Sequence, residues 1–363
     1  MLFKPDQPYE ALPLLPPATD LESKAVLKAC LAATRALAEL KGTGGLIPDQ
    51  TILINAIPLQ EAKASSEIEN IVTTQDNLFR GAANEEKVKD PATKEVLRYR
   101  AALRHGYEAL GNGRPLDLNV ILNVCQIIHD DDSIDFRRIG ENVYIGNHTP
   151  KRITYTPPSG GRTSQTLLKN LEHYILKPDA DTDPLVRMAV AHYQFEAIHP
   201  FLDGNGRTGR ILNLLMLIDA GLLDIPVLYL SRYVIEHKTD YYRLLQQVTE
   251  SQDWEPWLLY VLEGIRQTAL WTRDRVIAIR DLFDTTVKRV RAEAPSIYTK
   301  ELIELIFRQP YCKIAFVVDA GIAKRQTAGG YLKELERLGV LKSDPGGRET
   351  LYRHPALIDV LSS

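Results

Sequence analysis

The segment that decides the fold is His199-Pro-Phe-Leu-Asp-Gly-Asn-Gly-Arg-Thr-Gly-Arg210, which lies between two apolar stretches of the chain. Residues 185–198 before it are apolar nearly all the way round, which predicts the central, buried helix of a bundle. Pro200 disfavours helical geometry in the residue before it, so this helix should end at His199. A second helix should begin near Arg207 and stop at Gly221. The segment therefore joins the end of a buried helix to the start of the next one.

The loop has the composition of an anion-binding site. Glycines on both sides of Asn205 leave backbone N–H groups unobstructed at a helix N-terminus, where those groups have no internal partner and the helix dipole favours negative charge. Arg207 and Arg210 share one face of the first turn, and their forked donors match phosphate oxygens. The pattern predicts a polyphosphate site made of Gly204, Asn205, Gly206, Arg207, Thr208, Gly209 and Arg210.

Two side chains of the same segment can carry chemistry. Asp203 is its only carboxylate, and beside a polyphosphate it is a better Mg²⁺ ligand than a base, because Mg²⁺ takes one or two carboxylates plus phosphate oxygens. His199 faces the same loop and has the ordinary pKa that suits a general base near neutrality. A histidine before proline and a glycine-rich turn each have a structural explanation, but their joint occurrence within twelve residues favours a catalytic site.

The segment resembles the H-P-F-x-[DE]-G-N-G-R-[TS]-x-R signature of Fic-domain proteins at every position, and the similarity covers roughly residues 1–265. The resemblance implies an adenylyltransferase that transfers AMP from ATP, with Mg²⁺, to a Ser, Thr or Tyr hydroxyl of a target protein. It implies that His199 deprotonates that hydroxyl and that Asp203 holds the metal on the α- and β-phosphates. Arg207 and Arg210 would contact the β- and γ-phosphates. Phosphorylating relatives carry lysine where this chain has Gly206, which favours nucleotidyl transfer.

Residues 143–155 are expected to form a β-hairpin flap, because short β-rich runs flank a polar tip at residues 146–150. By resemblance, the flap clamps the target's backbone by strand addition and lies over the nucleotide. Its candidate residues are Ile145, Gly146, Asn147 and His148. Tyr241 and Tyr242 match a tyrosine pair that borders the family's nucleoside pocket, although paired tyrosines on an amphipathic helix are also common in a core or at its rim.

An inhibitory motif precedes the catalytic segment. Residues 65–70, with Ser65, Glu69 and Asn70, match the [ST]-x-x-x-E-[GN] motif of Fic proteins, and Ser65 and Glu69 share one helix face. Glu69 is predicted to pair with Arg210 and so to occupy the donor that the γ-phosphate needs. Because motif and core share one chain, this inhibition should be intramolecular. The motif is also compatible with a bifunctional enzyme that removes AMP, with Glu69 directing water.

The chain is predicted to have four parts: an N-terminal helical regulatory region (1–105), a Fic core (106–270), a connecting helix (271–294) and a winged helix-turn-helix (295–363). A capping box at Thr19 should start a helix that runs to about Lys41, and a second helix should follow Pro48. In the C-terminal part, three helices precede a hairpin, which is typical of a winged helix. Lys324, Arg325 and Gln326 open its third helix, and Arg348 lies on the wing. That part has ten Lys+Arg against eight Asp+Glu, so DNA, a protein or a second copy of the chain stay open as its partners.

Composition excludes several classes of protein. With 44 Lys+Arg, 47 Asp+Glu and a net charge of −3 over 363 residues, the chain is not a polycation held to nucleic acid by charge alone. Cys30, Cys125 and Cys312 have no metal-binding or disulfide spacing. There is no secretory leader pattern and no apolar run near the ~20 residues that span a bilayer, so a cytoplasmic protein without membrane contact is expected. We therefore predict a mostly α protein with a Fic-type helical core.

Overall fold

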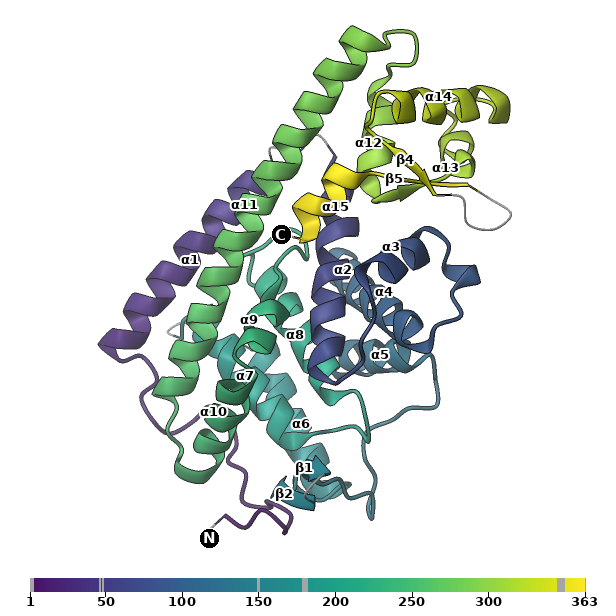
Figure 1. Ribbon diagram of the computed structural model, residues 1–363. Helices are drawn as coiled ribbons and strands as arrows, with labels where there is room; N and C mark the ends of the chain where they lie inside the picture. The colour runs from purple at the N-terminus through teal and green to yellow at the C-terminus, as the bar shows by residue number, and fades with distance from the viewer. Residues whose placement is uncertain are drawn as a thin grey trace.

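A computed structural model describes residues 3–45, 47, 49–148, 151–177, 182–344 and 350–362 (Figure 1). It is mostly helical, as predicted, with a β-hairpin and a small three-stranded sheet. The helices are α1 (Lys24–Gly44), α2 (Thr51–Ile68), α3 (Gln75–Ala83), a 3₁₀ turn (Glu85–Lys87), α4 (Pro91–Gly111), α5 (Leu118–His129), α6 (Arg162–Leu176), α7 (Pro184–Ile198), α8 (Asn205–Asp219), α9 (Leu230–Glu236), α10 (Lys238–Ser251), α11 (Glu255–Glu293), α12 (Lys300–Arg308), α13 (Ile314–Asp319), α14 (Arg325–Arg337) and α15 (Pro355–Ser362). None of the described helices is both long and apolar enough to cross a membrane.

Helix α7 is the central helix of the core, as its apolar sequence predicts (Figure 1). Asp183 caps it by accepting a hydrogen bond from the N–H of Leu185, and Pro184 occupies its first turn. Its side chains are buried along nearly its whole length, with α6, α8 and α11 packed around it. Trp257 of α11 donates its indole N–H to the carbonyl of Ala189, 2.9 Å away, which satisfies a polar group inside this core.

The N-terminal helix starts later than predicted. Helix α1 is capped by Ser23, whose hydroxyl accepts from the N–H of Val26, and not by Thr19. The carboxylate of Glu22 does not turn back to cap this helix; it accepts from the N–H of Asp183 at 2.8 Å, at the start of α7. The helix also continues through Gly42 to Gly44, with Gly45 as its C-cap, because it packs along α11 (Figure 1).

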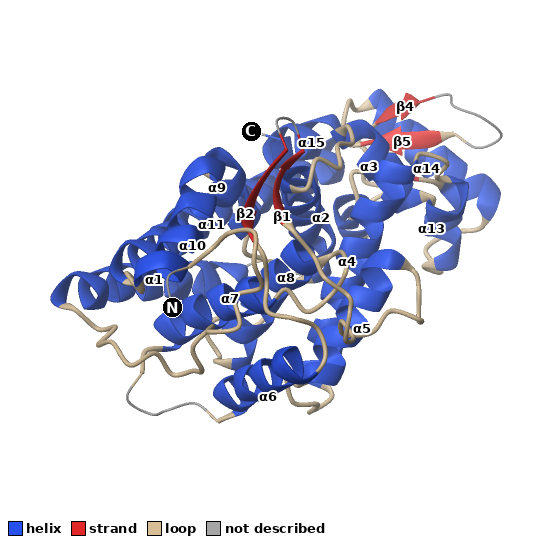
Figure 2. Cartoon of the chain, turned by 90° about the horizontal axis from the view of Figure 1, so that it is seen from below, coloured by secondary structure: helices blue, strands red, loops and turns tan. Residues whose placement is uncertain are grey.

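The predicted hairpin is present as β1 (Ile145–His148) and β2 (Lys151–Tyr155), which pair antiparallel (Figure 2). The polar tip is shorter than predicted, because Gly146, Asn147 and His148 belong to β1, while Thr149 and Pro150 lie outside the described residues. The hairpin is tied to α7 by the hydroxyl of Tyr155, which donates to the carbonyl of Ala197 at 2.8 Å.

An N-terminal strap without helix or strand, residues 3–15, runs along the base of the hairpin and was not predicted. The N–H of Tyr9 donates to the carbonyl of Thr156, and the Thr156 hydroxyl donates to the carbonyl of Pro5. Farther along, the side-chain amide of Asn170 exchanges two hydrogen bonds with the backbone of Leu15. The strap therefore joins the hairpin to α6.

Helix α11 is one helix of 39 residues, and it leads directly to the tail, residues 295–362 (Figure 1). The tail's helices α12, α13 and α14 lie where the sequence predicts them, with Thr299 capping α12. Its predicted hairpin, β4 (Lys342–Asp344) and β5 (Leu351–Arg353), gains a third strand, β3 (Tyr311–Cys312), which pairs with β5. Helix α15 was not predicted either. Arg348 lies outside the described residues, and the domain boundaries stay a prediction.

Candidate active site

The catalytic segment is held at the junction of α7 and α8. His199 has a left-handed backbone (φ 51°) that ends α7, as predicted from the proline after it. The loop is fixed by Arg137, whose guanidinium donates to the carbonyls of His199 (2.7 Å), Ile198 (3.0 Å) and Pro158 (2.9 Å). Arg137 is almost fully buried, and its own N–H binds the carbonyl of Pro200. The sequence reasoning missed this residue.

The loop backbone is set by Gly204 and Asn205. Gly204 has a left-handed backbone (φ 85°), and a Cβ at this position would lie 2.4 Å from the Nε2 atom of His129. The side-chain amide of Asn205 accepts from the N–H of Phe201 and donates to its carbonyl. The side chain of Asn205 thus braces the loop, and only its backbone N–H is left for an anion. The first intrahelical bond, from Thr208 to Gly204, leaves the preceding N–H groups of α8 without an acceptor in their own helix.

Arg210 is bound by residues of the predicted inhibitory motif, residues 65–70. It is nearly fully buried, its Nε donates to the hydroxyl of Ser65 at 2.8 Å, and its Nη2 donates to the carbonyl of Ser65 at 2.9 Å. The same Nη2 donates to the carboxylate of Glu69 at 2.8 Å, so the predicted ion pair is present. Asn70, just after α2, has the left-handed backbone (φ 64°) that ends this helix.

The ion pair shifts the pKa values of both partners. Burial alone would raise the pKa of Glu69, but the charge and hydrogen bond of Arg210 outweigh burial and lower it. Burial likewise opposes the charge on Arg210, and Glu69 overrides this and raises the pKa of the guanidinium. The carboxylate is seated on the start of α8, since a Cβ at Gly206 would lie 2.3 Å from the Oε1 atom of Glu69.

The guanidinium of Arg207 is paired with a carboxylate of another helix. Its Nη1 donates to the carboxylate of Glu95 on α4, and its side chain is 2% exposed. Its Nη2 lies 3.9 Å from the carboxylate of Asp203, whose side chain is 81% exposed. An exposed carboxylate at the start of α8 suits Mg²⁺, which needs few protein ligands when phosphates supply the rest. Among the described residues, no three His, Cys, Asp or Glu side chains cluster as a metal cage.

The environment of His199 differs from the prediction of an ordinary pKa. Burial first, and the charge of Arg137 second, lower the pKa of His199 to about 4. The imidazole is therefore neutral at pH 7, which is the protonation state that a general base requires.

Glu196, one turn before His199, is a second acid that the sequence reasoning missed. Burial raises the pKa of Glu196 to about 7, and Arg210 opposes this only in part. Its Oε1 atom is buried with no hydrogen-bond partner among the residues that the structure describes, and it would lie 2.5 Å from a Cβ at position 209. Gly209 is therefore needed for close packing of α7 against α8. In the sequence, the sign of Glu196 was a carboxylate within a largely apolar helix.

The two tyrosines of α10 lie in different environments. Tyr241 is buried, and its hydroxyl and the Nε2 atom of His192 lie 2.9 Å apart. It lines a cavity of about 20 Å³, shared with His192, Arg210 and Trp257, which is room for one water molecule. Tyr241 is thus a core residue, whereas Tyr242 is 43% exposed at the rim. Of the flap residues, Ile145 is half-buried, and nothing is described of the side chains of Asn147 and His148.

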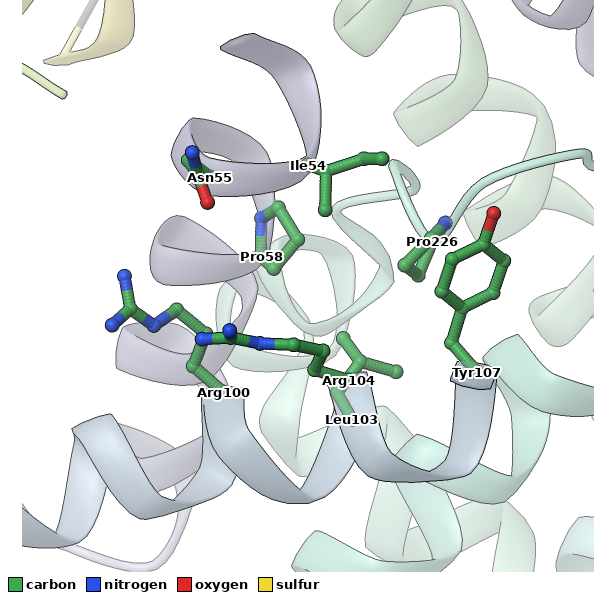
Figure 3. Close-up of a pocket in the computed structure, with 8 residues that line it drawn as sticks. All are labelled: Ile54, Asn55, Pro58, Arg100, Leu103, Arg104, Tyr107 and Pro226. Atoms are coloured by element: carbon green, nitrogen blue, oxygen red, sulfur yellow. The ribbon is translucent and has the colours of Figure 1, made fainter. Parts of the chain in front are cut away.

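A second hollow lies between α2 and α4 (Figure 3). Its volume is about 10 Å³, and its lining includes Pro58, Arg100 and Tyr107. None of the candidate site residues lines it, so it is separate from the catalytic segment.

Three parts of the chain match known families. Residues 27–108 match the Fic/DOC family N-terminal region, residues 115–217 match the Fic/DOC family, and residues 282–357 match the C-terminal domain of protein adenylyltransferase SoFic-like proteins. The chain is 33% identical over 180 residues to the protein adenylyltransferase Fic of Aedes aegypti, covering 48% of this chain and 33% of that protein. It is 31% identical over 138 residues to protein adenylyltransferase fic-1 of Caenorhabditis elegans, covering 38% of this chain and 24% of that protein. The chain thus spans a quarter to a third of the length of these curated relatives.

Solved structures share the fold. A crystal structure of a Fic family protein from Desulfovibrio desulfuricans G20 superposes with a TM-score of 0.57 at 21% identity, over 93% of this chain and 98% of that one. The structure of Fic-1 from C. elegans gives a TM-score of 0.53 at 21% identity, over 71% of this chain and 74% of that one. The motif, the three domain matches and the fold agree, and the chain belongs to the Fic/DOC family.

Proposed function

We propose that this protein is an adenylyltransferase that moves AMP from ATP to a Ser, Thr or Tyr hydroxyl of a target protein. The observation that supports this most is the juxtaposition at the α7–α8 junction. A neutral His199 lies at the end of a buried helix, beside a helix N-terminus with unpaired N–H groups and two buried arginines. That arrangement supplies a base, an anion site and charge stabilisation, which are the requirements of phosphoryl-type transfer.

In the proposed step, the target's hydroxyl oxygen forms a bond to the α-phosphorus of ATP. The bond from that phosphorus to the bridging oxygen breaks, pyrophosphate leaves, and the hydroxyl proton passes to His199. The N–H groups at the start of α8 hold the phosphate oxygens, and Arg210 takes the γ-phosphate once Glu69 has left it. Asp203 would hold Mg²⁺, which when bound neutralises charge on the phosphate oxygens.

We infer further that the protein is autoinhibited. Glu69 occupies Arg210 and lies against the backbone of Gly206, where phosphate oxygens would otherwise bind. A nucleotide can enter with its triphosphate misplaced, and small misplacements cost orders of magnitude in rate. The alternative role, in which Glu69 directs water to remove AMP, predicts that the wild-type protein strips label from an AMP-modified protein and the E69G variant does not.

The test compares ATP labelled at the α-phosphate with ATP labelled at the γ-phosphate, in the E69G variant with lysate as the source of targets. AMP transfer predicts protein labelling from the α-label only, and loss of that labelling in E69G/H199A with nucleotide binding retained. Labelling from the γ-phosphate would indicate kinase chemistry, and labelling that survives H199A would remove His199 as the base.

A further inference from the structure

We propose that the C-terminal tail is a clamp that holds the inhibitory segment in place, so that loosening the tail releases Glu69. This inference rests on the proposed autoinhibition and deepens it. The motif begins at Ser65 in the last turns of α2 and ends at Glu69 and Asn70, just after this helix and before α3. The tail contacts both α2 and α3. One set of contacts precedes the motif in the sequence and the other follows it. Together they therefore restrain the chain on both sides of residues 65–70.

The first contact is at the start of α2. Arg308, the last residue of α12, donates through its Nε to the carboxylate of Asp49 at 2.8 Å. Asp49 also accepts from the N–H and the hydroxyl of Thr51, at 2.9 and 2.6 Å, so the same carboxylate holds the first turn of α2. Burial opposes the charge on Asp49, but these hydrogen bonds and Arg308 together lower its pKa. Helices α12 and α15 also pack against α2.

The second contact is on α3, which begins five residues after Asn70. The hydroxyl of Tyr311, in β3, donates to the carboxylate of Asp76. Arg80 donates to Asp76 at 2.6 Å and also binds Asp344 of β4, and its guanidinium lies 5.3 Å from the centre of the Tyr311 ring. Two strands of the tail therefore hold α3 through one connected set of charged and aromatic groups.

Helix α2 can transmit this constraint to Glu69. It has 18 residues, about 27 Å at 1.5 Å per residue, and most of its side chains are buried. Glu69 is the first residue after α2. Its N–H and the N–H of Ile71 both donate to the carbonyl of Ser66 in the last turn of this helix. Glu69 is released from Arg210 either by rotation of its own side chain or by a shift of this turn. A fixed start of α2 and a fixed α3 oppose the shift of the turn.

The tail itself is packed against α11. The tail is attached to α11 by packing of α12 and α15 and by the edge-to-face contact of Phe283 with Phe307, whose ring centres are 5.1 Å apart. The tail is therefore supported by the core on one side and bears on the inhibitory segment on the other.

The experiment uses the full chain with the double change R308A/Y311F, which removes one group from each contact. The matched control is R337A, which breaks an exposed ion pair to Glu334 inside α14 and leaves both contacts intact. Hydrogen exchange is measured for the backbone of residues 65–72, a readout that needs no catalysis. We expect exchange there to become about 3- to 10-fold faster in R308A/Y311F than in R337A. The double change removes the partly exposed Arg308–Asp49 ion pair and the hydrogen bond from Tyr311 to the Asp76 carboxylate, and interactions of these kinds have that strength. Equal exchange in the two variants, with folding intact by circular dichroism, would overturn the clamp.

Labelling from α-labelled ATP then shows whether the clamp acts through Glu69. R308A/Y311F should raise incorporation about 3- to 10-fold in the wild-type background and leave it unchanged in the E69G background. An equal rise in both backgrounds would overturn the inference, because the tail would then act on catalysis directly. If E69G itself incorporates no AMP, the proposed function fails, while the exchange measurement still decides the clamp.

Discussion

Replacing Glu69 should change activity and stability in opposite directions. In E69G, Arg210 keeps its two bonds to Ser65 but loses its carboxylate partner. A hydrogen bond between charged groups is worth about 1.5–3 kcal/mol, so a triphosphate that competes with Glu69 should gain about 10- to 100-fold in correctly bound population. The rate of AMP incorporation should rise by the same factor while that population limits it.

The same change leaves a buried guanidinium without its counter-ion. Removing one partner of a fully buried pair costs about 3–5 kcal/mol. Here the side chain of Glu69 is 35% exposed, and Ser65 still satisfies part of Arg210, so about 2 kcal/mol of unfolding free energy should be lost. E69Q, which keeps a hydrogen-bond acceptor without the charge, should fall between wild type and E69G in both measurements.

The assay follows protein-bound label from α-labelled ATP over time, together with urea unfolding of each variant. The matched control is E67A, on the same helix, because Glu67 is partly exposed and pairs only with Lys63 one turn away in the described contacts. E67A should change the rate of AMP incorporation by no more than a fewfold and the unfolding free energy by no more than about 0.5 kcal/mol. Unchanged incorporation in E69G would refute the competition between Glu69 and the γ-phosphate. A rise in incorporation with no loss of stability would show that the ion pair is weaker than its burial implies.

Three further variants test other features. Burial lowers the pKa of His354 to about 4, so the neutral imidazole stabilises the fold above pH 6.5, and this stabilisation is lost as the pH falls towards 4. H354N can still cap α15 but cannot be protonated. Between pH 6.5 and 4 its unfolding free energy, measured with urea, should therefore fall by about 3 kcal/mol less than that of the wild type. G204A should lower the unfolding free energy by at least about 1–2 kcal/mol because of its left-handed backbone, whereas G330A, in the open middle of α14, should raise it by about 0.5–1 kcal/mol; equal effects would contradict both assignments. Lys238 donates to the carbonyl of Ile68 at the end of α2, so K238M should raise AMP incorporation a fewfold, and a decrease would show that Lys238 serves the nucleotide instead.

The sequence could predict the catalytic segment because its geometry is local. The end of α7 at His199 follows from Pro200, and the N–H groups without an intrahelical acceptor follow from the start of α8. The partners that shift its electrostatics could not be predicted, because they come from distant positions. Arg137 lies 62 residues from His199, and its charge together with burial lowers the pKa of that histidine, whereas Glu95 lies 112 residues from the Arg207 it binds.

The fold was predictable to a similar depth. A stretch that is apolar nearly all the way round located α7, and the cap at Thr299 located α12, but a capping box at Thr19 predicted the wrong start for α1. Glu22 found a better use at the start of α7, which no local pattern reveals. Strand β3 has only two residues, Tyr311 and Cys312, and a run so short exists only because β5 is there to pair with it.

Helix α11 has a mechanical consequence for the whole molecule. At 1.5 Å per residue its 39 residues form a rod of about 58 Å, with α1 alongside much of it and no proline after its first turn. Such a rod replaces the flexible linker that usually separates an appended domain from an enzyme, so the two ends keep a fixed separation and orientation. A structural change in the tail can then reach the core only as a small sliding or twisting of packed surfaces, and not as a rotation of the whole tail about a hinge.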